Sequence, residues 1–357
     1  MEQLKKISFL LLTFDNPKAK RVLDKNGIGW DRFFQLERTQ LQKAGFSAGE
    51  IDRIRHDPLL PAEEEIGKLK KSRFEIIFKT DGDYPPLLAE IYQPPEFIYV
   101  VGNRGILKKR MLAVVGSRRA STYGYSSIKR ILPDVCRAGL TVVSGMAYGI
   151  DSMAHHIALS QKTGTVGVNA GGLLHLYPQG NRSMIQKIIE EGAVISEFPL
   201  DTVARPFLFP IRNRIIAGVS KAVLVAEATL KSGSLITAKL ALEQDRDILA
   251  VPGNIDSSLS SGTNYLIQQG AKLVSSAQDI LEEFGIRLPS KQFVPPAVSP
   301  KEKKLLDLMG ENTVKGIDCF VETLHFSTSE VISLLMGLIL KNLVREEAGF
   351  YKKVYHG

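Results

Sequence analysis

The chain has 357 residues, which suggests two or three domains at the usual size of about 150 residues each. Hydrophobic residues make up 44% of it and charged residues 24%, a balance that excludes a predominantly disordered chain and predicts a sizeable core. The apolar run at residues 7–14 lacks a small-residue cleavage site, and no stretch approaches the roughly 20 apolar residues of a membrane-spanning helix. A soluble protein is therefore expected.

The two cysteines bear on the cellular compartment of the protein, and the basic charge bears on the kind of partner it binds. Cys136 and Cys319 lie far apart without the spacing of metal ligands, so reduced thiols in a cytoplasmic protein are expected. The net charge of +8 suits a polyanionic partner. Between Val101 and Leu140 nine lysines and arginines accompany one acidic residue, Asp134, so the basic charge is concentrated near one segment.

The first 288 residues predict two domains. Residues 1–72 read as short helices joined by polar segments, which indicates a small helical domain with a weak helix-hairpin-helix signal at Gly27-Ile28-Gly29. Residues 73–288 begin with a strand at 74–78 and two proline-rich bends, after which short apolar runs alternate with amphipathic helices. This alternation predicts an extended Rossmann-like, doubly wound and mostly parallel α/β sheet. Its strands are expected at 111–115, 140–143, 165–169, 193–196, 222–226, 248–251 and 272–274.

The end of the chain predicts a linker and a third domain. Residues 289–304 contain four prolines without apolar periodicity, as is typical of a linker. Residues 305–357 predict helices at 305–309, 317–324 and 327–341 and a hairpin around Gly349, which together suggest a winged helix. Ser327 and Glu330 form a capping box. Because the third helix has no basic residue, this domain is expected to pack or to bind protein rather than to read a major groove.

Ligands of an open α/β sheet lie outside the carboxyl ends of its strands, so the loops that follow the strands are candidate sites. After the first parallel strand come Gly116, Ser117, Arg118 and Arg119. Backbone amides at a helix N-terminus attract an anion, and an arginine can donate two hydrogen bonds to a phosphate. A tight turn with two solvated arginines is the alternative.

The second loop begins with Ser144 and Gly145, small residues that leave room beside the backbone. Asp151 at its end is expected to cap the following helix. His155 and His156 are adjacent in that helix and face different directions, which argues against a metal site.

The segment 205–214 combines two prolines, two phenylalanines and three arginines. Phe207 and Phe209 offer flat faces for unstacked bases, and Arg212 and Arg214 offer charge for phosphates, a combination that suits single-stranded nucleic acid. In the alternative, the phenylalanines fill the core while the arginines pair with acids such as Glu197.

The last loop has the same anion-binding character. It contains Lys231, Ser232, Gly233, Ser234 and Thr237 at the start of a helix. The sequence shows no Walker lysine motif, no cluster of metal ligands and no nucleophile paired with a base. A binding protein without a cofactor, rather than an enzyme, is predicted.

Four motifs carry a resemblance to a known family. They are VVGSRRAS at 114–121, SGMAYGID at 144–151, FPIRNRIIA at 209–217 and SGSLITA at 232–238, supported by Tyr84-Pro85 and AVPG at 250–253. Together, over roughly residues 74–285, they closely resemble the DNA-processing protein A family, also called DprA or Smf.

The resemblance implies a homodimer that binds single-stranded DNA and loads the RecA recombinase in natural transformation. It implies that Arg118 and its loop hold phosphates, that Arg212 and Arg214 shape the pocket, and that Phe207 or Phe209 meets a base. One alternative is a Rossmann-like nucleotide hydrolase of the lysine-decarboxylase-like family, whose Pro-Gly-Gly-x-Gly-Thr loop is absent here. Another is a scaffold whose pocket has lost its ligand.

Overall fold

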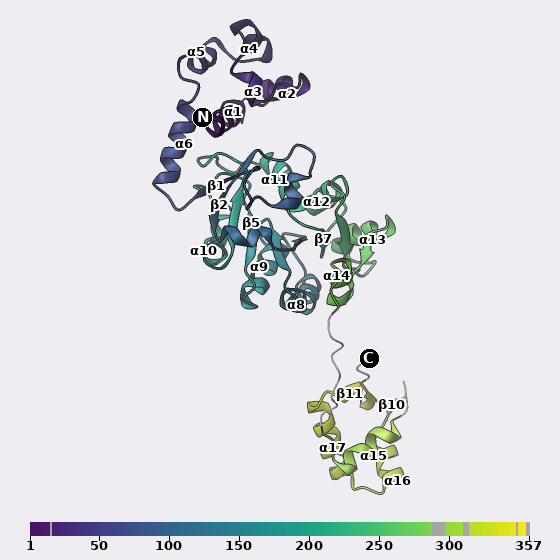
Figure 1. Ribbon diagram of the computed structural model, residues 1–357. Helices are drawn as coiled ribbons and strands as arrows, with labels where there is room; N and C mark the ends of the chain where they lie inside the picture. Colours follow the sequence, from purple (N-terminus) through teal and green to yellow (C-terminus); the bar gives the residue numbers. More distant parts are fainter. Residues whose placement is uncertain (15, 288–296, 310–313, 348, 355–357) are drawn as a thin grey trace. The chain divides into compact units, whose positions relative to one another are not determined.

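The computed structural model describes residues 1–14, 16–287, 297–309, 314–347 and 349–354, which fall into two compact units, Met1–Leu288 and Pro289–Gly357 (Figure 1). In its described part, the first unit contains a nine-stranded sheet in the order β1-β2-β6-β5-β4-β3-β7-β8-β9. The strands are β1 (Glu75–Phe78), β2 (Phe97–Gly102), β3 (Met111–Val115), β4 (Thr141–Ser144), β5 (Thr165–Val168), β6 (Ala193–Ser196), β7 (Ala222–Val225), β8 (Asp247–Ala250) and β9 (Lys272–Leu273).

The sheet is mostly parallel, as the sequence predicted. From β6 through β9 every neighbouring pair is parallel, and only β1 with β2 and β2 with β6 run antiparallel. The seven predicted parallel strands are confirmed to within about a residue at most ends. Strand β2 was not among the predicted strands, because the prolines that precede it indicate a bend.

Helices cover both faces of the sheet. They are α7 (Pro86–Ala89), α8 (Thr122–Arg137), α9 (Ile150–Ser160), α10 (Arg182–Glu191), α11 (Leu208–Gly218), α12 (Gly233–Leu242), α13 (Ser261–Gln268) and α14 (Ala277–Glu283), with short 3-10 turns η1 (Arg104–Lys108), η2 (Gln179–Asn181) and η3 (Ser258–Ser260). Since successive side chains of a strand point to opposite faces, β3 contributes Ala113 and Val115 to one core cluster and Leu112 and Val114 to another.

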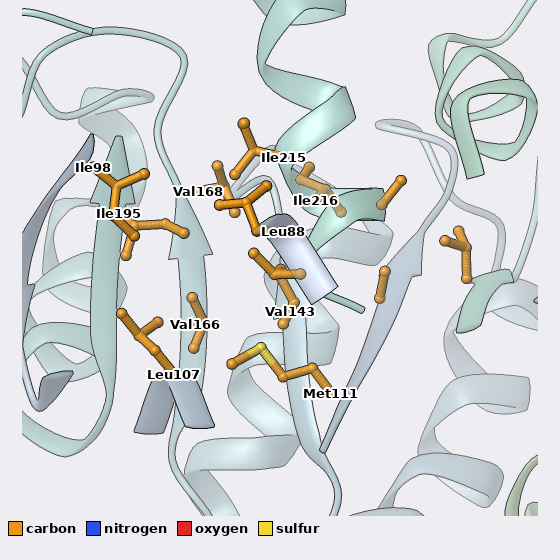
Figure 2. Close-up of a cluster of buried hydrophobic side chains, with 14 of the residues drawn as sticks. Leu88, Ile98, Leu107, Met111, Val143, Val166, Val168, Ile195, Ile215 and Ile216 are labelled. Carbon is orange, nitrogen blue, oxygen red and sulfur yellow. The ribbon is translucent and has the colours of Figure 1, made fainter. Parts of the chain in front are cut away.

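The first of these clusters lies between the sheet and helices α7, α11 and α12. Figure 2 shows Leu88 of α7 and Ile215 and Ile216 of α11 packed over Val143 and Val168 of the strands. The second cluster joins the opposite face to α8, α9 and α14. Strands buried on both faces need continuous apolar runs, which is why their positions could be read from the sequence.

The order of the strands reverses direction at β3. From β3 the chain proceeds through β4 and β5 to β6 on one side, whereas β7, β8 and β9 follow on the other side of β3. The loops after β3 and β7 therefore lead away from each other. In open α/β sheets this arrangement leaves a crevice at the carboxyl ends of the two strands.

The described residues before β1 are mostly helical. The helices are α1 (Glu2–Phe14), α2 (Pro17–Lys25), α3 (Trp30–Phe33), α4 (Arg38–Ala44), α5 (Ala48–His56) and α6 (Leu60–Lys70). They enclose a core of their own that includes Phe33 and Ile51. Buried Glu65 of α6 also accepts a hydrogen bond from the backbone N–H of Leu200 at 2.7 Å, and the compact unit includes both regions. A separate helical domain ending at residue 72 stays a prediction.

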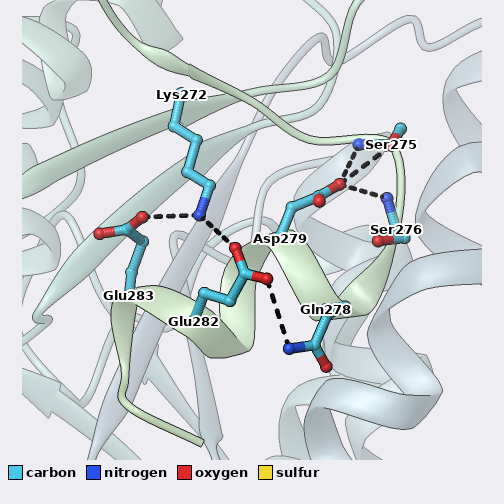
Figure 3. A network of polar contacts seen from close by, with 7 residues as sticks. All are labelled: Lys272, Ser275, Ser276, Gln278, Asp279, Glu282 and Glu283. Carbon is cyan, nitrogen blue, oxygen red and sulfur yellow. Dashed lines mark hydrogen bonds and ion pairs between the residues drawn. The ribbon is translucent and has the colours of Figure 1, made fainter. Parts of the chain in front are cut away.

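Helix α14 follows β9, the last strand of the sheet, and is held by polar contacts at both ends. Figure 3 shows the Asp279 carboxylate accepting hydrogen bonds from the backbone N–H groups of Ser275 and Ser276, as part of a capping box. At the end of the same helix Glu282 and Glu283 pair with Lys272 of β9 at 3.0 and 2.7 Å. These contacts fix the helix at both ends.

The second unit contains α15 (Pro300–Leu308), β10 (Val314–Lys315), α16 (Ile317–Leu324), α17 (Thr328–Leu340), β11 (Val344–Glu347) and β12 (Phe350–Lys353). The helix expected at 305–309 starts earlier, because Ser299 and Glu302 form a capping box ahead of it. The predicted linker, 289–304, lies partly outside the described residues, and its last residues, 300–304, belong to α15. The winged helix stays a prediction.

Two smaller observations concern membranes and thiols. Among the described residues no single helix is long and apolar enough to cross a membrane, and α16 and α17 reach that length only as a pair bent by 116°. Cys136 and Cys319 are free thiols. Burial in α8 raises the pKa of Cys136 to about 11, so this thiol is protonated and unreactive at neutral pH.

Candidate nucleic-acid interface

A pocket of about 740 Å³ lies at the carboxyl ends of β3 and β7, where the strand order predicts a crevice. It collects side chains from the loops after both strands and from α11 and α12. Ten of the predicted site residues line this pocket: Gly116, Ser117, Arg118, Arg119, Phe209, Arg212, Ser232, Gly233, Ser234 and Thr237.

Five predicted residues do not line this pocket. Ser144 and Gly145 are buried beneath it, where the Ser144 hydroxyl donates a hydrogen bond to Val114 O at 2.6 Å. Phe207 and Lys231 are exposed outside it. Arg214, predicted to contact DNA, pairs instead with Glu197, whose side chain is 11% exposed, and donates to Gln93 O at 3.0 Å. The alternative, that arginines of this segment pair with acids such as Glu197, therefore holds for Arg214.

Glu227, directly after β7, ties the two loops together. It is 2% exposed, and its carboxylate accepts hydrogen bonds from the backbone N–H and the hydroxyl of Ser121 at 2.8 and 2.5 Å. Its backbone oxygen accepts a further bond from Ser117 N at 2.7 Å. Ser121 in turn caps α8. Glu227 was not predicted as a site residue, because its partners lie 106 residues away and no local pattern points to them.

Phe209 forms the aromatic wall of the pocket. The guanidinium carbons of Arg118 and Arg212 lie 5.4 and 5.9 Å from its ring centroid, within the range of cation–π attraction. The ring of Tyr177 meets it edge-on at 5.6 Å. Neither phenylalanine of this segment plugs the core, since Phe207 is 56% exposed and the buried residue between the two is Leu208.

Arg212 is an arginine buried at the base of the pocket. It is 4% exposed, donates hydrogen bonds to Gly145 O at 2.9 Å and to Val168 O, and its buried Nε has no partner among the described residues. A Cβ at Gly145 would lie 2.5 Å from the guanidinium, so any other residue there would force Arg212 to shift. Burial lowers the pKa of Arg212 to about 10, so it keeps its charge at neutral pH.

Asp151 is the acidic neighbour of this arginine. Its carboxylate accepts a hydrogen bond from Gly145 N at 3.2 Å, in the loop before α9, while Gly149 is the N-cap residue of that helix. The predicted capping role is therefore wrong, because the carboxylate turns back toward the preceding loop. Burial raises the pKa of Asp151 to about 6 against the opposing effect of Arg212.

The N-terminus of α12 supplies hydroxyls and backbone amides. The Ser232 hydroxyl caps the helix, accepting a hydrogen bond from Ser234 N at 3.4 Å, and lies 2.7 Å from the Ser234 hydroxyl. The positive end of a helix attracts anions. With Arg118, Arg119 and Arg212 on the other walls, the lining residues carry three arginines and one carboxylate.

The histidine pair takes no part in the site. His155 is fully buried, and its Nδ1 lies 2.9 Å from the hydroxyl of Thr165, which itself donates to Val142 O. Burial lowers the pKa of His155 to about 3, which keeps the ring neutral. Within the part of the chain that the structure describes, no three His, Cys, Asp or Glu side chains are grouped as metal ligands.

Comparisons with known proteins agree with this geometry. The family model for DNA recombination-mediator protein A matches residues 75–285. Protein Smf of Escherichia coli (strain K12) is 34% identical over 329 residues, 89% of this chain and 88% of that protein. The structure of DNA processing protein A from Streptococcus pneumoniae is 35% identical, with a TM-score of 0.64 over 80% of this chain and 97% of that one.

A second solved structure is that of DNA processing protein A from Helicobacter pylori, described for its single-stranded DNA binding mode. It is 27% identical, with a TM-score of 0.54, and covers 59% of this chain and 95% of that one. With the family model covering more than half of the chain and the pocket at the expected edge of the sheet, the chain belongs to the DNA recombination-mediator protein A family.

Proposed function

We propose that this chain binds single-stranded DNA without sequence preference in the pocket at the carboxyl ends of β3 and β7. The observation that carries the proposal is the Phe209 ring, which stands in the pocket wall with Arg118 5.4 Å and Arg212 5.9 Å from its centroid. Base stacking on an aromatic ring is worth about 1–3 kcal/mol and tolerates every base. A duplex hides the faces of its bases, so this wall favours an unpaired strand.

The charges of the pocket support the same ligand. Arg118 and Arg119 are exposed at the rim, and the start of α12 adds backbone amides and hydroxyls. Phosphate contacts of this kind fix the register of a strand without reading its sequence. A single strand supplies both the stacking base and the phosphate that these walls would contact.

The wider role follows from the family resemblance. We propose that the chain, as a homodimer in the cytoplasm, loads the RecA recombinase onto the bound strand during natural transformation. Binding and delivery of a strand need no bond to be made or broken, so the proposed role is that of a mediator rather than an enzyme.

A titration of fluorescent oligo-dT tests the DNA site, with wild type, Arg118→Ala and Lys109→Ala compared at about 50 and about 200 mM salt. Lys109 is likewise exposed and lies two residues before β3 begins, at the amino end of the strand, so it controls for net charge. We expect Arg118→Ala to weaken binding at least about tenfold, as loss of a charge-assisted contact predicts, and to reduce the salt slope by about 0.7.

Lys109→Ala should bind as the wild type does. Equal binding by Arg118→Ala and wild type would move the DNA site away from this pocket, and a duplex competitor as effective as the single strand would contradict the preference for unpaired bases.

A further inference from the structure

A second pocket of about 640 Å³ adjoins the first within the same unit. Tyr177 lines both pockets and stands edge-on to Phe209, with 5.6 Å between the ring centroids and 75° between the ring planes. A strand that leaves the Phe209 wall in the direction of Tyr177 enters this second pocket next. None of the residues that line this second pocket was among the site residues predicted from the sequence.

Three apolar side chains that line the second pocket are open to solvent, and we call them its apolar floor. Leu174 is 47% exposed, Tyr177 44% and Val203 56%, and all three line the same hollow. Contiguous exposed apolar side chains on a globular protein commonly mark a binding surface. A flat apolar partner such as a nucleobase fits this floor.

The rim of the pocket is basic and contains no carboxylate. Arg73 and Arg182 line it, together with the amide side chains of Gln179 and Gln186. Arg73 donates a hydrogen bond to Gln186 at 3.1 Å, and neither arginine forms an ion pair with any described residue. Two uncompensated guanidinium groups beside an apolar floor match the phosphates and bases of a single strand.

The amide side chains of buried Asn169 and half-buried Asn181 hold these walls in place. The side chain of Asn169, 1% exposed, donates to Gly171 O at 2.9 Å and Gly172 O at 3.0 Å and accepts from Tyr177 N at 3.2 Å. The Asn181 amide donates to Met146 O at 2.9 Å, which fixes the start of α10. The pocket is therefore formed before a ligand arrives.

We propose that this second pocket binds the nucleotides next to the one at Phe209, with a base on the floor of Leu174, Tyr177 and Val203 and phosphates on Arg73 and Arg182. The inference rests on the proposed function, because it extends the path of the same strand. Tyr177 lines both subsites.

The test compares oligo-dT lengths from about 4 to about 16 nucleotides on the full chain. The variant is Arg73→Ala/Arg182→Ala. Its matched control is Lys71→Ala/Lys187→Ala, which removes the same charge from the same two segments outside the pocket lining. All four side chains are exposed, so the fold is expected to survive both changes, as thermal unfolding will show.

We expect the arginine variant to bind the shortest oligonucleotides as the wild type does and to lose about tenfold in affinity for the longest. Its salt slope on long strands should fall by about 1.4, since two phosphate contacts are lost at about 0.7 each. Val203→Asp, which leaves both arginines in place and adds a carboxylate to the floor, should show the same length-dependent loss.

If the arginine variant binds long strands with the affinity and salt slope of the wild type, the second subsite is wrong. An equal loss of affinity in the lysine control would overturn it as well. Failure of the proposed function looks different. In that case wild type binds no oligonucleotide of any length, or Arg118→Ala has no effect on the shortest ones.

Discussion

Asp151 sets how much of the charge on Arg212 is available to a phosphate. Above the pKa of about 6, the Asp151 carboxylate is ionised, and its negative charge offsets the positive charge of the buried Arg212 guanidinium. Below this pKa the Asp151 carboxyl is neutral. An anion in the pocket should therefore bind more tightly as the pH falls through this value. No pattern in the sequence could reveal this coupling, because the two residues lie 61 positions apart and meet only in the folded chain.

Asp151→Asn tests that coupling. The amide imitates the protonated acid, so oligo-dT affinity at pH 8 should rise about threefold to tenfold, which corresponds to about 1 kcal/mol of altered charge interaction. The increase in affinity that wild type shows between pH 8 and pH 5 should be smaller in the variant. The control is Asp134→Asn in α8, because Asp134 pairs with Arg137 and not with Arg212. Weaker binding by Asp151→Asn in a folded protein would contradict the argument.

Phe209→Ala removes the proposed stacking face. Loss of stacking predicts weaker oligo-dT binding by about 1–3 kcal/mol, a factor of about five to above a hundred. Phe207→Ala is a close control, because Phe207 lies two residues away, is 56% exposed and does not line the pocket. If Phe207→Ala weakened binding and Phe209→Ala did not, the base would lie outside the pocket.

At the scale of elements, what the sequence could predict depended on burial. Strands β3 to β7 are fully buried, four or five residues long and rich in apolar side chains, which made them recognisable in the sequence. The strand β2 is also apolar, but it follows Pro94-Pro95 and pairs antiparallel with β6, so neither its position nor its direction continued the βαβ pattern. Helix α15 began earlier than expected, because the capping box at Ser299 was not recognised among the prolines.

The capping box of α14 gives a prediction about stability. Burial tends to raise the pKa of Asp279, but hydrogen bonds from Ser275 and Ser276 outweigh it and hold the pKa below its usual range (Figure 3). Asp279→Ala should therefore lower the free energy of unfolding by about 1 kcal/mol at neutral pH. Because the folded-state pKa is depressed, this contribution is present above the ordinary pKa of about 3.9 and is lost as the pH falls through the folded value.

Urea unfolding at pH 7 and at pH 3 measures the difference in free energy of unfolding between wild type and Asp279→Ala. The control is Gln278→Ala, at a half-buried position next to Asp279 in the same helix. A difference between wild type and Asp279→Ala that persists unchanged at pH 3 would contradict an ionised cap.

At the scale of the whole molecule, the loops named from the sequence do meet at one place. Arg118 after β3, Phe209 at the start of α11 and Ser232 before α12 line one pocket, since the carboxyl ends of parallel strands share an edge. The sequence could not show which side chains turn away. Arg214 lies two residues after Arg212 and pairs with Glu197, and Tyr177, which lines both pockets, belongs to a loop without a recognisable pattern.

The proposed site belongs entirely to the unit Met1–Leu288, which has its own core, whereas Pro289–Gly357 encloses a separate one around Phe320 and Leu335. The most direct measurement is photo-crosslinking of an oligonucleotide that carries iododeoxyuridine, followed by mass spectrometry of the crosslinked peptides from the full chain. We expect crosslinks at Phe209 and Tyr177, the aromatic residues of the pocket walls. Crosslinks confined to Pro289–Gly357 or to the helices before β1 would contradict it.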